Sequence, residues 1–272
     1  MARSFVAANS DYLSRSGAIF SAYPFTFACW TAPTGTGGNI FSVGNTSSDS
    51  YYFRLIAAAD NLSFSVGALS EGFVNYGSPA TGVLSGEWRH VAVVAGSSTS
   101  RSTWYGGAQI GSSASPATYP TGLNVTALGT LYRTTRTTHL TGAIAHAAFW
   151  SASLSSAEIA SLATGTSPLL IRPASLIEYW PLRGLACDAP EPGVYSGRNL
   201  SVVGTSWARD PSPVWSPSLR VHDGQPWYSP LPGGGAIPST AAGQPVGLDP
   251  VSRSAFGPWF GVRALGSPSW RD

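Results

Sequence analysis

Apolar and polar residues alternate in short runs over the first 150 residues of the chain. Clusters of Gly, Pro, Asn, Ser and Thr separate these runs: SFVAA, PFTFACW, NIFSVG, YYFRLIA, LSFSV, WRHVAVVAG, STWYGG and TGAIAHAAFW. A period of two indicates β-strands, and turn residues between the runs indicate tight connections. No strand is followed regularly by a helical pattern, so the sequence predicts an all-β antiparallel sandwich or jelly roll.

One short helix is predicted directly after the strand at 142–150. Ser155 and Glu158 have the spacing of a capping box, and Leu154 and Ile159 take the positions of a hydrophobic staple around it. Gly165 supplies the stop. Along the strand itself, strict alternation predicts two sets of residues on opposite faces: Ile144, His146 and Ala148, against Ala145, Ala147 and Phe149.

Residues 166–209 form a second block with two strand patterns. SLIEYWPL is ended by Pro181, and SGRNLSVVGTSW follows after an acidic loop. Two strands alone are marginally stable, so we expect 166–209 to add strands to the same sandwich. The predicted sandwich domain is therefore 1–209.

Residues 210–272 differ in composition from the rest of the chain. They hold 11 of the 21 prolines, a density that excludes regular helix and central strand. Disordered tails are normally poor in aromatic residues, yet this segment has many. We therefore predict an extended C-terminal arm that either wraps its own sandwich or, as we favour, docks on a neighbour. Its expected anchors are Trp215, Trp227, Tyr228, Phe256, Trp259, Phe260 and Trp270.

Four segments, taken in order, resemble elements of the laminin G-like, concanavalin A-like domains. They are PFTFACW at 24–30, GEWRHVAVVAG at 86–96, STWYGGAQIGSS at 102–113 and TGAIAHAAFWSASLSSAEIASL at 141–162. The resemblance implies a jelly-roll sandwich. Two further family-like segments, SLIEYWPLRG and SGRNLSVVGTSW, come after the closing helix here, whereas the family commonly has them before the first core strand. The arm at 210–272 has no counterpart in the family.

Charge and hydropathy exclude two classes of partner. The formal net charge is +2, which is too small for a nucleic-acid footprint. No uncharged apolar run approaches the roughly 20 residues of a membrane helix. The first residues lack the apolar core of a signal peptide, so delivery outside a cell is expected by another route, such as virus assembly and lysis.

The two cysteines leave two interpretations open. Cys29 lies in an apolar strand, which favours a buried free thiol. A disulfide between Cys29 and Cys187 is the alternative.

The sequence predicts no enzyme and no cofactor. Hydrolysis by a sandwich glucanase needs paired carboxylates, and no two acids share a strand face at i, i+2 or i, i+4. The glucanase signature E-x-D-x-x-E is missing, no two histidines have metal-ligand spacing, and no nucleophile elbow or phosphate loop is present.

The family resemblance implies a possible Ca²⁺ site at the sandwich rim. The loop at 44–50 offers Asn45 and Asp49 as ligands. The alternative is a solvated loop whose Asn and Asp side chains set turns, since one carboxylate is few for a hard cation.

Sugar binding by sandwiches uses exposed aromatic rings with polar groups beside them. Arg133 and Arg136 are expected to pair with acidic sugars. The alternative is that most of the candidate rings fill the core or make cross-strand pairs. The candidate rings are Tyr51, Tyr52, Trp104, Tyr105 and Tyr132, with Tyr76 and Tyr119 as further platforms.

Two functions follow from these features. The first is a non-enzymatic virion structural protein, such as a phage decoration, head-fibre or tail-associated subunit, with an exposed lectin-like sandwich. It would be anchored through 210–272 to other virion proteins or neighbouring copies, as a homo-oligomer or lattice-bound subunit, and would touch a host surface glycan. The alternative is a carbohydrate-binding or adhesion module on a bacterial cell surface.

Overall fold

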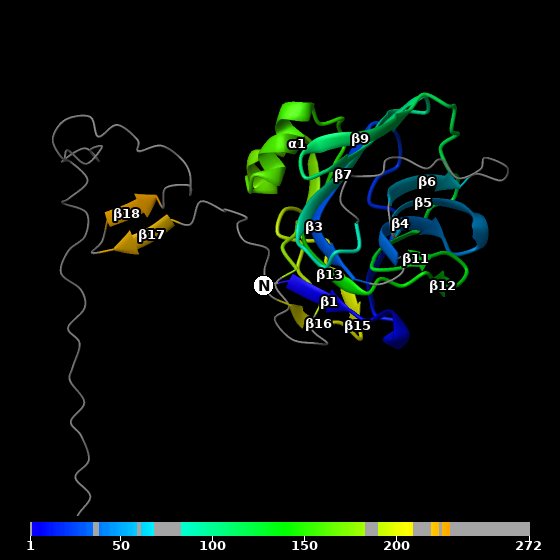
Figure 1. Cartoon of the computed structure of the whole chain (residues 1–272), viewed down its shortest axis with the longest axis horizontal. Helices are drawn as coiled ribbons and strands as arrows, with labels where there is room; N and C mark the ends of the chain where they lie inside the picture. Colours follow the sequence, from blue (N-terminus) through cyan, green and yellow to red (C-terminus); the bar gives the residue numbers. More distant parts are fainter. Residues whose placement is uncertain are drawn as a thin grey trace, which may run out of the picture. The chain divides into compact units, whose positions relative to one another are not determined.

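The structure is a computed structural model that describes residues 2–34, 38–58, 61–67, 83–182 and 190–208, and the backbone of 219–222 and 225–228. Two antiparallel sheets pack face to face over a hydrophobic core (Figure 1). The predicted all-β sandwich is confirmed.

The first sheet has eight strands in the order β16-β1-β13-β3-β7-β8-β9, and β14 also pairs with β13. The strands are β1 (Ala2–Phe5), β3 (Phe25–Pro33), β7 (Arg89–Ser97), β8 (Ser100–Tyr105), β9 (Ala108–Ser113), β13 (Gly142–Trp150), β14 (Leu176–Trp180) and β16 (Ser206–Ala208).

The second sheet has six strands in the order β15-β2-β10-β4-β5-β6. On β5, Phe53 and Leu55 face the core, so Tyr52 and Arg54 face outward. The strands are β2 (Tyr12–Ser16), β4 (Gly38–Asn45), β5 (Ser48–Ala58), β6 (Asn61–Gly67), β10 (Val125–Leu128) and β15 (Ser201–Val203).

Phenylalanine rings from both sheets meet in the core. Phe27 on β3 lies 4.2 Å from Phe41 on β4 and 4.8 Å from Phe149 on β13, measured between ring centroids. All three side chains are fully buried. Burying one such ring contributes roughly 1.5–3 kcal/mol, so these contacts hold the two sheets together.

A β-bulge changes the faces predicted for β13. The pairing of β13 with β3 shifts register between Ala145 and Ala148, and His146 adopts a φ of 53°. Ile144 therefore faces the core together with Ala147 and Phe149. The expected strict alternation is wrong here, because the extra residue of a bulge moves the following side chains to the other face.

Helix α1 (Ser156–Ala163) confirms the predicted capping box. Ser155 is the N-cap, and its hydroxyl accepts from the N–H of Glu158, whose carboxylate accepts from the N–H of Ser155. Leu154 and Ile159 are both buried in the layer between the helix and the eight-stranded sheet. Three short 3-10 helices lie elsewhere: Ala7–Asn9, Pro168–Leu170 and Pro173–Ser175.

Strands from the block at 166–209 extend both sheets. β14 pairs with β13 and β16 pairs with β1 in the eight-stranded sheet, while β15 pairs with β2 in the other. Every one of these pairings is antiparallel. Cys29 is a free, buried cysteine, and Cys187 lies outside the described residues.

Two small hairpins complete the description: β11 (Leu131–Tyr132) with β12 (Arg136–Thr137), and β17 (Leu219–His222) with β18 (Gln225–Tyr228). For β17 and β18, which include Trp227 and Tyr228, only the backbone is described. The other predicted anchors lie outside the described residues: Trp215, Phe256, Trp259, Phe260 and Trp270. Among the described helices, none has the length and hydropathy needed to cross a membrane.

Candidate functional site

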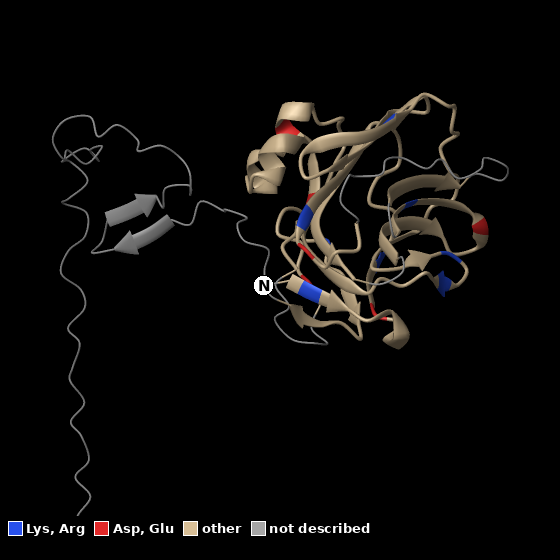
Figure 2. Ribbon diagram, in the orientation of Figure 1, with Lys and Arg blue, Asp and Glu red and all other residues tan. Residues whose placement is uncertain are grey.

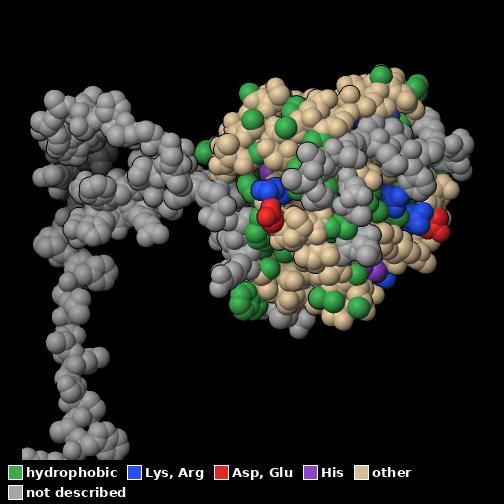
Figure 3. Space-filling view, in the orientation of Figure 1, with side chains coloured by type: hydrophobic (Ala, Val, Ile, Leu, Met, Phe, Trp, Pro, Cys, Tyr) green, Lys and Arg blue, Asp and Glu red, His purple; other side chains and the backbone are tan. Residues whose placement is uncertain are grey.

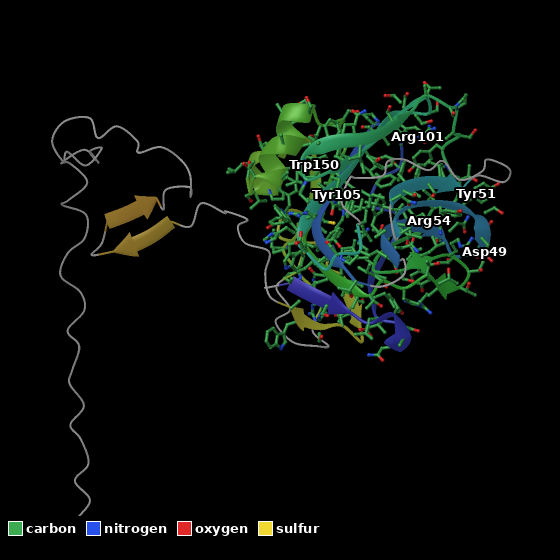
Figure 4. The ribbon with its side chains drawn as sticks, in the orientation of Figure 1. Asp49, Tyr51, Arg54, Arg101, Tyr105 and Trp150 are labelled. Carbon is green, nitrogen blue, oxygen red and sulfur yellow. The ribbon has the colours of Figure 1, made fainter. Side chains whose placement is uncertain are left out.

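Tyrosine and arginine side chains gather on the outer face of the six-stranded sheet. Figure 3 shows this as a group of blue side chains beside one red one, on the side of the molecule where β4, β5 and the β11–β12 hairpin lie. Figure 4 places Arg54 and Asp49 there. We call this group the Arg–Tyr surface, and its members are Tyr12, Tyr52, Arg54, Tyr132, Arg133 and Arg136.

A glycine lets the β11–β12 hairpin lie directly on β4. A Cβ atom at Gly44 would collide with the carbonyl oxygen of Tyr132. Next to this contact, the Ser42 hydroxyl donates to the carbonyl of Thr130 at 2.8 Å and accepts from the N–H of Tyr132 at 3.1 Å. These bonds fix the hairpin over the sheet, and the hairpin carries Tyr132, Arg133 and Arg136.

Arg136 lies against two aromatic rings. Its guanidinium carbon is 4.3 Å from the centroid of Tyr132 and 5.1 Å from that of Tyr12. One of its amino groups donates to the Tyr132 hydroxyl at 2.6 Å. The two rings meet edge to face at 6.1 Å. Cation–π contacts of this kind hold an exposed arginine in one position.

Tyr52 is buried, with 7% of its surface exposed, so it does not offer the exposed ring that the sequence predicted, and two further arginines contact it. The guanidinium of Arg133 lies 5.3 Å from the ring centroid of Tyr52, and that of Arg54 lies 5.6 Å from it. Burial lowers the pKa of Arg54, and the positive charge of Arg133 lowers it further. Two guanidinium groups, those of Arg54 and Arg133, therefore lie near the same tyrosine ring, and that of Arg54 is partly desolvated.

Asp49 provides the negative charge of the same surface. Its Oδ1 lies 3.6 Å from Nε of Arg133 and accepts the Thr134 hydroxyl at 2.6 Å. Its backbone carbonyl also accepts from Arg133, at 2.7 Å. Asp49 is therefore committed to the hairpin. Figure 2 shows a red position beside blue ones on the side of the sandwich where β5 and the β11–β12 hairpin lie.

The structure separates the other predicted rings from this surface. Trp104 packs between β8 and α1, where its indole N–H donates to the Ser102 hydroxyl at 2.9 Å. Tyr105 lies in the main core with 9% of its surface exposed. Tyr51 is half-buried on the opposite face of β5 from Tyr52. Figure 4 shows Tyr105 away from Asp49 and Arg54. Tyr76 lies outside the described residues.

Two members of the surface were missing from the sequence prediction. Arg54 stands two positions after Tyr52 on the same strand, so the period of two carried a signal for it. Tyr12 comes from a strand far away in sequence, and only the pairing of β2 with β10 and of β10 with β4 brings it near Tyr132.

The loop residues proposed for calcium already have protein partners. The amide oxygen of Asn45 accepts from the N–H of Ser47 at 2.8 Å, and its amide nitrogen donates to the carbonyl of Thr121 at 3.3 Å. Asp49 faces Arg133. Ca²⁺ takes six to eight oxygens, so these two residues do not make up a calcium shell. Within the described ranges no three His, Cys, Asp or Glu side chains converge on a metal position.

Glu178 holds a loop through its carboxylate. The carboxylate accepts hydrogen bonds from the N–H groups of Tyr179, Tyr195, Ser196 and Arg198, at 2.8 to 3.2 Å. Burial alone would raise the pKa of Glu178, but the N–H groups of Arg198 and Tyr179 and the Ser196 hydroxyl outweigh it and lower the pKa. A carboxylate in this state is a structural anchor rather than an acid catalyst.

Every other carboxylate in the described ranges also has a structural contact. Asp11 accepts the N–H of Val6, Asp49 pairs with Arg133, Glu87 pairs with Arg89, Glu158 caps α1 and Glu191 pairs with Arg3. Each of these acids is therefore engaged with a group of the fold, whereas glycoside hydrolysis requires two carboxylates that face the substrate.

Three depressions elsewhere on the described residues are weaker candidates for a ligand-binding site. One of about 350 Å³ is lined by hydroxyl groups of β8 and β9, and its arginine, Arg101, donates to the carbonyls of Ser98 and Ser115. One of about 290 Å³ lies beside Tyr119, whose hydroxyl donates to the carbonyl of Phe20. A third, beside His90, holds about 10 Å³, which is room for one water.

The fold defines a class, the concanavalin A-like β-sandwiches. A family profile described as the concanavalin A-like lectin/glucanases superfamily matches residues 7–160. The chain belongs to that superfamily. No curated protein sequence matches it.

Solved structures share the fold at low sequence identity. A putative carbohydrate binding protein from Bacteroides ovatus is 14% identical with a TM-score of 0.55, over 75% of this chain and 58% of that one. A heptameric SAP-like pentraxin from Limulus polyphemus is 16% identical with a TM-score of 0.49, over 60% and 81%. The CBM40 of a Ruminococcus gnavus IT-sialidase, bound to alpha2,3 sialyllactose, is 17% identical with a TM-score of 0.48, over 56% and 93%.

Proposed function

We propose that this chain is a non-enzymatic glycan-binding sandwich, carried on a virion as a decoration, head-fibre or tail-associated subunit. One observation carries the glycan-binding part: the half-buried rings of Tyr12 and Tyr132 lie against the exposed guanidinium of Arg136 on the outer face of the six-stranded sheet. A tyrosine ring stacks on the apolar face of a sugar, while arginine and hydroxyl groups hydrogen-bond to its oxygens.

The carboxylates support a role without catalysis. Those in the described ranges hold loops, caps and ion pairs of the fold. Each of them is engaged with a group of the fold, whereas the general acid and nucleophile of a glycosidase face the substrate.

The glycan-binding proposal is tested by replacing Tyr132 with alanine. Tyr132→Ala removes a ring and the hydroxyl that accepts from Arg136. We expect binding to a glycan array to fall by about tenfold or more, since an aromatic anchor contributes on the order of 1–2 kcal/mol. Trp207→Ala is the matched control, because Trp207 is an exposed aromatic on the other sheet, with 66% of its surface accessible. Equal binding by the parent and Tyr132→Ala would contradict this site.

The virion part of the proposal is supported by the composition of 210–272. Proline-rich segments pay little conformational entropy when they bind in an extended form, and aromatic rings supply contact area. The segment suits attachment to other virion structural proteins or to neighbouring copies.

Attachment is tested by deleting residues 210–272. We expect the truncated chain to lose its place in purified particles, as measured by mass spectrometry of gradient-purified virions, while the sandwich keeps its circular dichroism spectrum. Particles that carry the truncated chain at full copy number would rule out this mode of attachment.

The alternative is an adhesion module on a bacterial cell surface. The Arg–Tyr surface alone supports this alternative, because it would bind a glycan equally well on a virion or on a cell surface. Light scattering distinguishes the two: a monomer with a clear glycan specificity favours the adhesion module, and a defined oligomer or lattice favours the virion subunit.

A further inference from the structure

The β11–β12 hairpin carries two arginines of the Arg–Tyr surface, and one of them faces an acidic side chain. Arg133 and Arg136 contribute two guanidinium groups, and among the described residues Asp49 is the acid that pairs with one of them. Burial is the main cause of the lowered pKa of Arg54, and the positive charge of Arg133 lowers it further, so the guanidinium groups repel one another. A bound anion would relieve that repulsion.

The two arginines of the β11–β12 hairpin differ in how far their charge and their N–H donors are already used within the protein. Arg133 is compensated by Asp49, through the ion pair and the bond to its backbone carbonyl. Arg136 is exposed and uses one N–H on the Tyr132 hydroxyl, and within the described ranges it makes no ion pair. A guanidinium has five N–H donors, so four remain for a ligand.

We propose that the Arg–Tyr surface binds the acidic group of a glycan, a carboxylate or a sulfate ester, with Arg136 as the residue that contacts it. The inference rests on the proposed glycan-binding function and adds the chemical class of the ligand. The fork of N–H groups on arginine matches the two or three oxygens of such a group.

Two tyrosines fix the position of the Arg136 guanidinium before a ligand binds. Tyr12 and Tyr132 hold the guanidinium between two rings, so less side-chain freedom is lost when an anion binds. The same rings lie beside the charge, where the apolar face of a sugar would stack. Asp49 restricts how an anionic ligand can bind. Its carboxylate lies at the edge of the surface and repels any negatively charged group of the ligand that comes close to it.

The experiment compares acidic and neutral forms of the same oligosaccharides. The full chain is titrated with galacturonic acid oligomers and with their carboxyl-reduced, neutral counterparts, and with dextran sulfate and dextran oligosaccharides of equal length, at one ionic strength. We expect one acidic member to bind at least tenfold more tightly than its neutral counterpart. The pair that shows the difference identifies carboxylate or sulfate as the group recognised.

Variants assign the contact to Arg136. Arg136→Gln is expected to weaken binding of the acidic oligomer by about tenfold or more, because a hydrogen bond to a charged group is lost. Arg136→Lys keeps the charge without the fork and should fall between parent and Arg136→Gln. Arg89→Gln is the matched control, since it removes one exposed positive charge from the other sheet. Asp49→Asn should strengthen binding severalfold, because it frees Arg133.

The outcomes separate this inference from the proposed function. Equal affinity for acidic and neutral oligomers, with Tyr132→Ala still lowering it, overturns the acidic ligand and leaves glycan binding in place. Equal losses in Arg136→Gln and Arg89→Gln also overturn it, because binding then follows net charge alone. Failure to bind any of the oligosaccharides overturns both. Melting curves of each variant confirm that the compared proteins are folded.

Discussion

A buried histidine lies between the eight-stranded sheet and helix α1. His90 is 2% exposed, its ring is 5.8 Å from that of Trp30, and its Nδ1 has no hydrogen-bond partner among the described residues. Burial lowers the pKa of His90 to about 3, so the folded protein holds this ring neutral at physiological pH.

Acid should therefore destabilise the sandwich through His90. The unfolded chain takes up a proton near pH 6.5 and the folded one only near pH 3, so the contribution is complete above pH 6.5 and is lost as pH falls from 6.5 towards 3. The loss approaches about 1.4 kcal/mol per pH unit. Urea unfolding between pH 7 and pH 4.5 measures it. His90→Asn and His90→Gln should both show a shallower fall than the parent, and parallel curves would contradict the assignment.

At the scale of elements, local signals predicted local structure. The capping box of α1 and the staple residues Leu154 and Ile159 were readable because all partners lie within six positions of one another. The strands were readable from their period of two and from the turn residues between them.

Features that depend on contacts between strands far apart in the sequence could not be predicted from local sequence patterns. The bulge at His146 follows from how β13 meets β3, and the period of β13 alone gave the wrong face for Ile144. Of the residues predicted to bind glycan, Tyr132, Arg133 and Arg136 lie on the Arg–Tyr surface, and Tyr52 is buried beneath its arginines. Trp104 and Tyr105 do not lie on it, because a ring's pattern along one strand does not tell which layer covers it.

At the scale of the whole molecule, an ion pair joins the start of the sandwich to its last block. Nε of Arg3 on β1 lies 2.5 Å from Oε1 of Glu191, and both side chains are at most 2% exposed. Arg3 also donates to the hydroxyl of Thr205 at 3.4 Å. The pair links β1 to the segment that supplies β15 and β16.

Breaking this pair on one side should be costly. Arg3→Ala removes the guanidinium that pairs with the buried carboxylate of Glu191, and we expect the free energy of unfolding to fall by about 3–5 kcal/mol. The double variant Arg3→Met with Glu191→Leu removes both charges and should recover most of the loss. Urea unfolding at pH 7 measures both. Arg89→Gln breaks an exposed pair and should cost about 1 kcal/mol or less. Similar losses in Arg3→Ala and Arg89→Gln would refute the argument.

Both neighbours of β1 in the sheet come much later in the chain, and this affects how the chain folds during translation. Arg3 pairs with Ile144 on one side, and Ser4 pairs with Ser206 on the other. At about 5–20 residues per second, β1 leaves the ribosome on the order of ten seconds before its first neighbour is translated. The nascent chain must carry that strand unpaired through this interval. A ribosome that stalls before residue 206 would release a product whose eight-stranded sheet ends on the bare backbone edge of β1.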